Sequence, residues 1–154
     1  MPDVVDPPTR SRMMSGIRGK DTKPELIIRR YLHSCGFRFR LHRKDLPGQP
    51  DLILPKYKTA IFVHGCFWHK HGGCKYAASP KSRALFWEEK LGRNVIRDQE
   101  HLSALVAMGW RVVVVWECGL KHSFDKVDEL KKMIVSESRV DLIWPSEPPR
   151  PKKN

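Results

Sequence analysis

The chain has 154 residues, of which 40% are hydrophobic, and this is enough for one compact domain with a real core. Its 29 Lys and Arg against 17 Asp and Glu give a formal net charge of +12, which favours a polyanionic partner such as a nucleic acid. No apolar run approaches the roughly 18 residues that span a bilayer, and the first residues lack the pattern of a signal peptide. We therefore expect a cytoplasmic protein with no membrane partner, whose four cysteines stay reduced or bind metal.

The first 20 residues are expected to form an N-terminal arm apart from a main domain over residues 21–144. Thr9 can cap a short helix over residues 10–18. Its face carries Arg10, Arg12, Arg18 and Lys20, interleaved with the apolar residues Met13, Met14 and Ile17. Its basic face is either a solvated surface over a small apolar stripe or an arm that lies on phosphates.

Helix and strand patterns follow in the next 45 residues. The sequence from Thr22 to Glu25 fits a capping box, and the helix that it starts runs to about Ser34. Alternating apolar and polar residues over 37–41 are typical of a half-buried strand. Residues 51–54 and 59–63 are predicted to pair as an antiparallel hairpin.

A loop over residues 65–82 precedes a long predicted helix from about 81 to 108, in which Gly92 is a candidate kink. The apolar stripe of this helix comprises Phe86, Leu91, Val95, Leu102, Leu105 and Val106. Residues 110–116 form an almost continuous β-branched run, typical of a central strand that is buried on both faces.

The C-terminal part is predicted to hold a helix over residues 125–136, an edge strand over 140–144 and a disordered tail over 145–154. The order of elements predicts an α/β fold with a mixed sheet between layers of helices.

Cys66, His71, Cys74 and Cys118 form a candidate zinc set. Zinc in structural sites takes four tetrahedral N and S ligands, and a short loop can wrap His71 and Cys74 around one ion. Cys118 follows the central strand, whose end can lie beside the end of strand 59–63. The alternative is a pair of loop thiols and a separately buried Cys118. Cys35 is expected to be a small buried residue.

A second group of residues suggests phosphodiester hydrolysis. Antiparallel pairing puts Asp51 and His64 at the same edge of the sheet, and Asp51 could bind Mg²⁺, which prefers hard oxygen ligands. His64 and His69 could move a proton or stabilise phosphate charge, although single histidines are often structural. Glu25 could assist Asp51 or act only as the capping-box residue.

Three aromatic residues accompany this group: Phe67, Trp68 and Trp87. They are either a small satellite core under the loop or a set of rings that enters a base stack. Insertion between bases is easiest where the duplex is already weak, as at a mismatch.

Several segments together closely resemble the very short patch repair DNA mismatch endonucleases, over roughly residues 1–120. They include Leu46-Pro-Gly-Gln-Pro-Asp51, Phe62-Val-His-Gly-Cys-Phe-Trp-His69, Arg97-Asp98 and Val115-Trp-Glu-Cys118. The resemblance implies a restriction-endonuclease-like fold, three-layered α/β/α with a central mixed sheet and a structural zinc loop. It also implies Mg²⁺-dependent nicking of one DNA strand on the 5′ side of the T in a T:G mismatch, which arises from deaminated 5-methylcytosine.

The resemblance also assigns roles to individual residues. Asp51 and the Val63 main-chain carbonyl would bind Mg²⁺, and His69 would activate water with help from His64 and Glu25. Zinc would be held by the set named above. The three aromatic residues would enter the base stack from the major groove, and the helix over residues 10–18 would contact the minor-groove side.

The sequence departs from related sequences at two places, and two alternative functions also fit it. Phe62-Val-His64 stands where the wider superfamily has an acidic residue and a lysine, and the spacing between His71 and Cys74 is one residue longer than in some members. A restriction-type nuclease that cuts undamaged duplex, or a zinc-stabilised DNA-binding module without catalysis, would fit the same residues. We expect a bacterial, nucleoid-associated monomer that binds mismatched duplex DNA, with mismatch-repair accessory proteins as further candidate partners.

Overall fold

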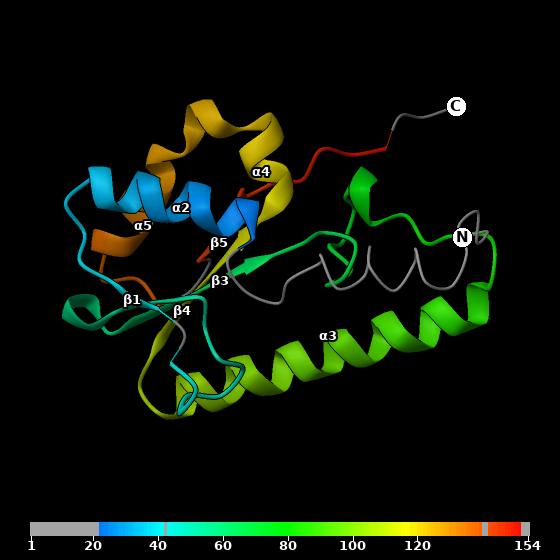
Figure 1. Cartoon of the computed structure of the whole chain (residues 1–154), viewed down its shortest axis with the longest axis horizontal. Helices are drawn as coiled ribbons and strands as arrows, with labels where there is room; N and C mark the ends of the chain where they lie inside the picture. Colours follow the sequence, from blue (N-terminus) through cyan, green and yellow to red (C-terminus); the bar gives the residue numbers. More distant parts are fainter. Residues whose placement is uncertain (1–21, 42, 140–141, 152–154) are drawn as a thin grey trace, which may run out of the picture.

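The structure, a computed structural model, describes residues 22–41, 43–139 and 142–151. A five-stranded sheet in the order β1-β2-β3-β4-β5 lies between α2, α4 and α5 on one face and α3 on the other (Figure 1). β1, β2 and β3 pair antiparallel, whereas β3, β4 and β5 pair parallel. This three-layered mixed α/β fold confirms the predicted class. The arm with Arg10, Arg12, Met14 and Arg18 lies outside the described residues.

The predicted hairpin and central strand are confirmed with small shifts of their ends. β2 spans Leu52–Leu54, η1 spans Pro55–Tyr57 and β3 spans Thr59–His64. β4 spans Arg111–Trp116 and pairs parallel with β3 over its whole length, so that His64 is the partner of Trp116.

The period of two along the strands divides the core between the two faces of the sheet. On the side of α2 and α5, the sheet buries Leu52, Leu54, Ile61, Val113 and Val115. On the side of α3, it buries Ile53, Ala60, Phe62, Val112 and Val114. Because the middle strands are covered on both faces, they need the continuous apolar sequence that predicted them.

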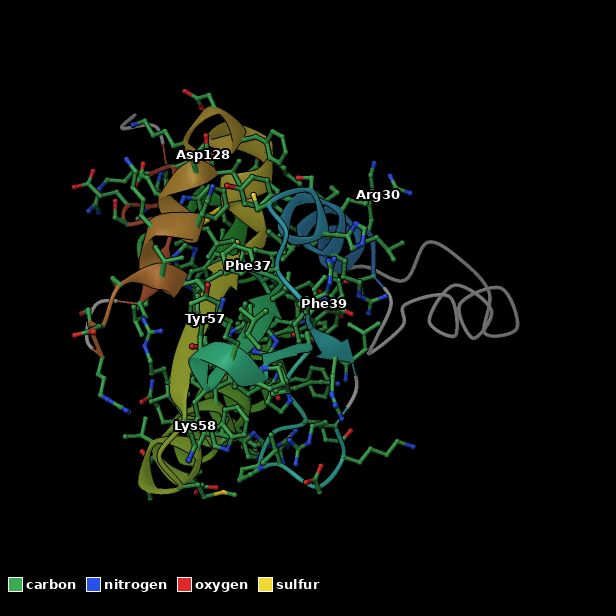
Figure 2. All side chains as sticks on the ribbon, turned by 90° about the vertical axis from the view of Figure 1, so that its left-hand side faces the viewer. Arg30, Phe37, Phe39, Tyr57, Lys58 and Asp128 are labelled. Carbon is green, nitrogen blue, oxygen red and sulfur yellow. The ribbon has the colours of Figure 1, made fainter. Side chains whose placement is uncertain are left out.

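The helices begin and end where local chemistry dictates. α2 spans Lys23–Ser34, and the Thr22 hydroxyl caps it by accepting a hydrogen bond of 3.4 Å from the Glu25 amide. Gly36 follows with a φ of 88°. The chain then returns to the sheet through Phe37, whose ring meets Tyr57 edge to face with centroids 5.6 Å apart (Figure 2).

α3 is a continuous helix over Ala84–Ala107, so Gly92 does not interrupt it. Its predicted apolar stripe is only partly correct. Leu91 and Leu105 are buried, but Phe86 and Val106 are 40% and 53% exposed. The helix extends beyond the sheet, and none of the described strands lies over its outer part (Figure 1). None of the helices in the described part of the chain is long and apolar enough to cross a membrane.

Other elements differ from their predicted limits. β1 is only Arg40–Leu41, with Leu41 38% exposed, because an edge strand has a single partner. α4, Glu117–His122, was not predicted, and α5 is the shorter Asp128–Val135 preceded by η3, Phe124–Lys126. β5, Ile143–Trp144, is the predicted edge strand and pairs with β4.

The last described residues run beside the loop that follows β3. The Lys75 amide donates a hydrogen bond of 2.8 Å to the Pro149 carbonyl. The division into arm, domain and disordered tail stays a prediction.

Candidate active site and metal cluster

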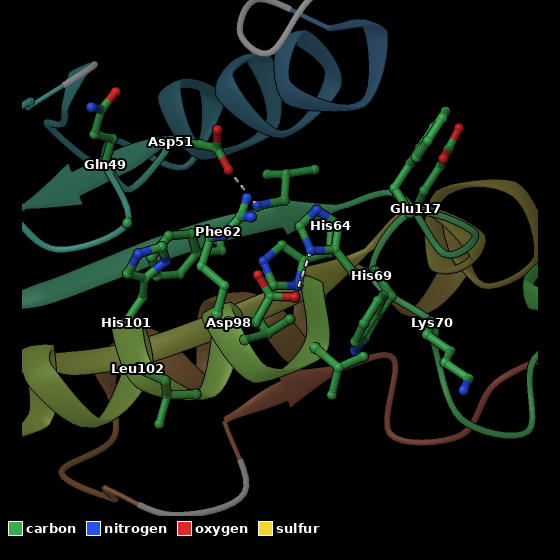
Figure 3. A pocket seen from close by; sticks show the side chains of 18 of the residues that line it. Gln49, Asp51, Phe62, His64, His69, Lys70, Asp98, His101, Leu102 and Glu117 are labelled. Carbon is green, nitrogen blue, oxygen red and sulfur yellow. Dashed lines mark hydrogen bonds and ion pairs between the residues drawn. The ribbon is translucent and has the colours of Figure 1, made fainter. Parts of the chain in front are cut away.

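A cleft of about 1020 Å³ opens where the start of β2 and the ends of β3 and β4 face α3 and the first turn of α2. Glu25, Asp51, His64, His69 and Asp98 all line it, and Figure 3 shows four of them by label. Residues that the sequence separates by up to 73 positions therefore share one cavity. Asp51 directly precedes β2 and His64 ends β3, whereas the helices and the loop after β3 supply the others.

Asp51 occupies the predicted place at the sheet edge. Its amide donates to the Ile61 carbonyl at 3.0 Å, and its Oδ2 accepts from the Val63 amide at 2.7 Å. Burial raises the pKa of Asp51 to about 7, the nearby Glu25 carboxyl adds to this rise, and the Val63 amide opposes it. Two carboxyl groups that lie so close in a buried place can hold a cation through hard oxygen ligands.

Glu25 is almost fully buried on the first turn of α2. Its Oε2 accepts a hydrogen bond of 3.1 Å from Arg29 Nη2, one turn further along the helix. The guanidinium offsets part of the negative charge of the pair, and its charge lowers the pKa of Asp51.

The two histidines lie ring on ring in the cleft. The His64 and His69 centroids are 3.8 Å apart with planes 3° apart. Burial is the main cause that lowers the pKa of His64 to about 3, and repulsion from His69 adds to it, so His64 is neutral at physiological pH. His69 Nδ1 lies 2.7 Å from Asp98 Oδ2 on α3, and both side chains remain partly accessible to the cleft.

Asp98 is the main residue whose role the sequence did not reveal. Arg97-Asp98 contributed to the family resemblance, but nothing in the spacing connected a carboxylate on the long helix with His69. A hydrogen-bonded carboxylate fixes the imidazole tautomer and leaves Nε2 free to accept a proton. Asn94, one turn earlier on α3, donates a hydrogen bond of 3.0 Å to the Trp68 carbonyl and holds the same loop.

The predicted zinc set also comes together. The donor atoms of Cys66, His71, Cys74 and Cys118 all lie within 4.8 Å of one another, and all four residues are buried. His71 Nδ1 is 3.5 Å from Cys118 Sγ, and the Cys118 amide donates to Cys66 Sγ at 3.4 Å. Separate loop thiols with a distant Cys118, the alternative reading of the sequence, do not describe this arrangement.

The chemistry of this cluster fits zinc. Bonds of about 2.3 Å to sulfur and 2.0 Å to nitrogen give a tetrahedron with edges of roughly 3.5 Å, comparable to the contact between His71 and Cys118. Burial raises the pKa of the Cys66 thiol to about 11 and also raises that of Cys118, while it lowers the pKa of His71. A bound dication would favour the thiolates that burial disfavours, and the neutral imidazole is the form that binds metal. The cluster can therefore hold a metal ion such as zinc.

The three aromatic residues form one half-buried group beside the cleft. Phe67 lies 5.1 Å from Trp68 and 5.3 Å from Trp87 between ring centroids, and the two tryptophans are 5.9 Å apart. All three contacts are edge to face, a favourable arrangement for aromatic pairs. Phe67 and Trp68 directly precede His69, so the group and the imidazole share one loop.

The chain is similar to a known protein family and to several individual proteins. A family model described as DNA mismatch endonuclease Vsr matches residues 2–75. A type II nicking enzyme of Xanthomonas oryzae pv. oryzae, V.XorIIP, is 52% identical over 120 residues, which cover 78% of this chain and 88% of that protein. The DNA mismatch endonuclease Vsr of Escherichia coli is 43% identical over 129 residues, covering 84% and 82%.

These matches place the chain among the endonucleases, enzymes that hydrolyse nucleic acid and can use a cleft with carboxylates and imidazoles. More narrowly, the chain belongs to the Vsr family of DNA mismatch endonucleases, whose fold is restriction-endonuclease-like. A nicking enzyme of Neisseria meningitidis, V.NmeAIP, is 41% identical over 134 residues and extends the similarity to 87% of this chain.

Proposed function

We propose that this protein nicks one strand of duplex DNA on the 5′ side of the T in a T:G mismatch and so starts very short patch repair. The observation that carries the proposal is the position of His69. This residue pairs with Asp98 in the cleft that holds Asp51, and it directly follows the aromatic pair on the same loop.

The proposed chemistry begins with His69 as general base. Its Nδ1–H donates to the Asp98 carboxylate, so Nε2 can take a proton from the attacking water. Asp98 then stabilises the imidazolium that forms. His64 is neutral and stacks on His69, so it can donate an N–H to a phosphate oxygen without repelling the charge that develops on its neighbour.

We assign Asp51 and the Val63 main-chain carbonyl to Mg²⁺, with Glu25 assisting. The ion would neutralise charge on the phosphate and polarise it toward attack. The raised pKa of Asp51 supports this assignment, because a buried carboxylate beside a second one gains most from a nearby cation. Zinc at Cys66, His71, Cys74 and Cys118 would be structural, since four protein ligands leave no open position.

Recognition of the mismatch is assigned to Phe67, Trp68 and Trp87. Unstacking a base step costs a few kcal/mol, and stacking a base on an aromatic ring returns about 1–3 kcal/mol. The balance favours sites where pairing is already weak. The Arg10, Arg12, Met14 and Arg18 arm would contact the DNA backbone, and we expect the protein to act as a monomer near the nucleoid.

An end-labelled duplex with one T:G pair tests the proposal, with the same duplex fully paired as the control. Mg²⁺-dependent nicking of the T strand alone, on the 5′ side of the mismatched T, is the expected result. Equal cutting of the paired control would indicate a restriction-type enzyme. Binding without cutting in ample Mg²⁺ would indicate a DNA-binding module and overturn both enzymatic readings.

A further inference from the structure

Aromatic rings connect the Cys/His cluster to the catalytic imidazoles without interruption. His71 stacks on Trp116 with centroids 4.0 Å apart and planes 2° apart. Trp116 meets His64 edge to face at 5.2 Å, and His64 stacks on His69. We propose that Trp116 is a positioning residue, which transmits the position of the metal ligand His71 to the two imidazoles in the cleft. This inference rests on the zinc and nuclease roles proposed above.

The register of the sheet puts Trp116 in this place. Trp116 ends β4 and is the parallel partner of His64 at the end of β3. Cys118 lies two residues further on, in the first turn of α4. The Trp116 side chain packs against both the α3-side core and the three clustered cysteines. It therefore sits at the end of a central strand and touches both sites.

His64 depends on ring contacts for its orientation. Its Nδ1 is buried and has no hydrogen-bond partner among the described residues. Within the described part of the chain, no hydrogen bond to Nδ1 therefore orients the His64 ring. Its ring neighbours are Phe62 at 5.6 Å, Trp116 at 5.2 Å and His69 at 3.8 Å. Loss of the Trp116 ring would remove one of these three contacts, so His64 should turn and the face on which His69 stacks should move with it.

The Trp116 ring also restrains His71, a member of the Cys/His cluster. A parallel contact at 4.0 Å covers one face of the His71 imidazole, while its Nδ1 points to Cys118 Sγ at 3.5 Å. Such an outer contact orients a ligand ring in the way that hydrogen bonds do at other metal sites. Trp116 thus contacts both sites while it also lines the cleft, so its loss should change both sites, and DNA affinity has to be measured apart from the nicking rate.

The test uses the full-length, zinc-loaded protein and four variants. Trp116→Leu removes the ring, and Trp116→Met does so with an unbranched side chain in case the leucine variant folds poorly. Trp116→Tyr keeps a ring of similar reach. Trp110→Leu is the matched control, because Trp110 precedes the same strand at its opposite end and packs on the α3-side core.

Three measurements separate positioning from general stability. They are the ¹⁵N chemical shifts of the histidine rings, the rate of zinc transfer to a chromogenic chelator, and single-turnover nicking with DNA affinity measured separately. For Trp116→Leu we expect shifted His64 and His69 signals and faster zinc transfer. We also expect about 100-fold slower nicking at unchanged DNA affinity, the loss typical of a reacting group displaced by about 1 Å.

Trp116→Tyr should stay within about tenfold of the parent, because it retains part of the ring contact. Trp110→Leu should lower the melting temperature but leave the histidine signals and zinc transfer unchanged. Unmoved His64 and His69 signals in both ring-deleted variants would overturn the proposal. A parent protein without zinc would overturn it too. A parent protein that nicks neither the T:G duplex nor the fully paired control would overturn the proposed function. The His64 and His69 signals would still decide whether Trp116 positions the two imidazoles.

Discussion

His69 Nδ1 lies 2.7 Å from Asp98 Oδ2, although the two residues are 29 positions apart and belong to a loop and a helix. This contact ties the loop after β3 to α3 at the centre of the cleft. The hydrogen bond from Asn94 to the Trp68 carbonyl adds a second tie one turn away. The long helix therefore sets the position of the imidazole as much as the strand before it does.

Asp98→Ala should slow single-turnover nicking by about 10²-fold or more, because His69, the proposed base, loses the partner that fixes its tautomer and would stabilise its charged form. DNA affinity should stay within about threefold, since Asp98 carries no positive charge that could bind phosphate. Glu100→Ala removes an exposed carboxylate from the same helix and serves as the control. A rate equal to that of the control would contradict the assignment.

Asp51→Asn should abolish Mg²⁺-dependent nicking, because the amide oxygen is a weaker ligand than a carboxylate. The amide can still accept the hydrogen bond from the Val63 amide, so the fold should remain intact. Titration of Mg²⁺ against the nicking rate checks this expectation. Residual activity near the parent rate at high Mg²⁺ would exclude Asp51 as the main ligand.

The same substitution should change how stability depends on pH in the metal-free protein. The pKa of Asp51 is about 7 in the folded state, above its ordinary value of 3.8. The folded state therefore holds an extra proton between these values, and the free energy of unfolding falls as pH rises through this window. Asp51→Asn should remove that decline and be more stable than the parent at pH 8 by a few kcal/mol, on the order of the shift itself. Denaturant titrations at pH 5 and pH 8 in a chelator measure it, and parallel curves for the two proteins would contradict it.

Much of the fold followed from local pattern. The capping residues at Thr22 to Glu25, the hairpin and the β-branched run of β4 each have a strong signal and were predicted within a few residues. The zinc set was predicted because thiols and imidazoles at these spacings have few other uses. Antiparallel pairing then sufficed to bring Asp51 to the end of β3.

The remaining features depend on how distant elements pack. The pairing of His69 with Asp98 requires the orientation of α3 across the sheet, which helical periodicity alone does not give. The same holds for Trp116, which the sequence places only at the end of the central strand over residues 110–116. The exposed part of α3 was predicted as buried because an apolar stripe cannot show where the sheet beneath it ends.

Cys118→Ser should lower zinc content and stability together. The serine hydroxyl is a poor zinc ligand, and binding energy at a structural site contributes directly to folding. Zinc measured per chain after gel filtration, and the melting temperature with and without chelator, test this. Cys35→Ser is the control, because Cys35 lies outside the cluster. Unchanged zinc content in Cys118→Ser would remove Cys118 from the ligand set.

Two glycine substitutions should act in opposite directions. A Cβ at Gly119 would lie 2.6 Å from the Trp144 ring and 2.7 Å from Pro145, so Gly119→Ala should destabilise by about 1–3 kcal/mol. Gly92 lies within α3 with nothing within 4 Å of such a Cβ, so Gly92→Ala should stabilise by about 0.5–1 kcal/mol. Chemical denaturation measures both. Destabilisation of equal size in the two variants would contradict the packing seen around Gly119.

The closeness of Cys66 and Cys118 has a consequence for the unfolded chain as well. The two residues are 52 positions apart, and the segment between them contains all of α3 and β4. An ion that bridges them would close this segment into a ring, as a cross-link does. Loop-closure entropy for such a ring corresponds to about 4 kcal/mol. The parallel pairing of β3 with β4, the most non-local step in assembling the sheet, would then start from neighbouring strand ends and should be faster when metal binds early.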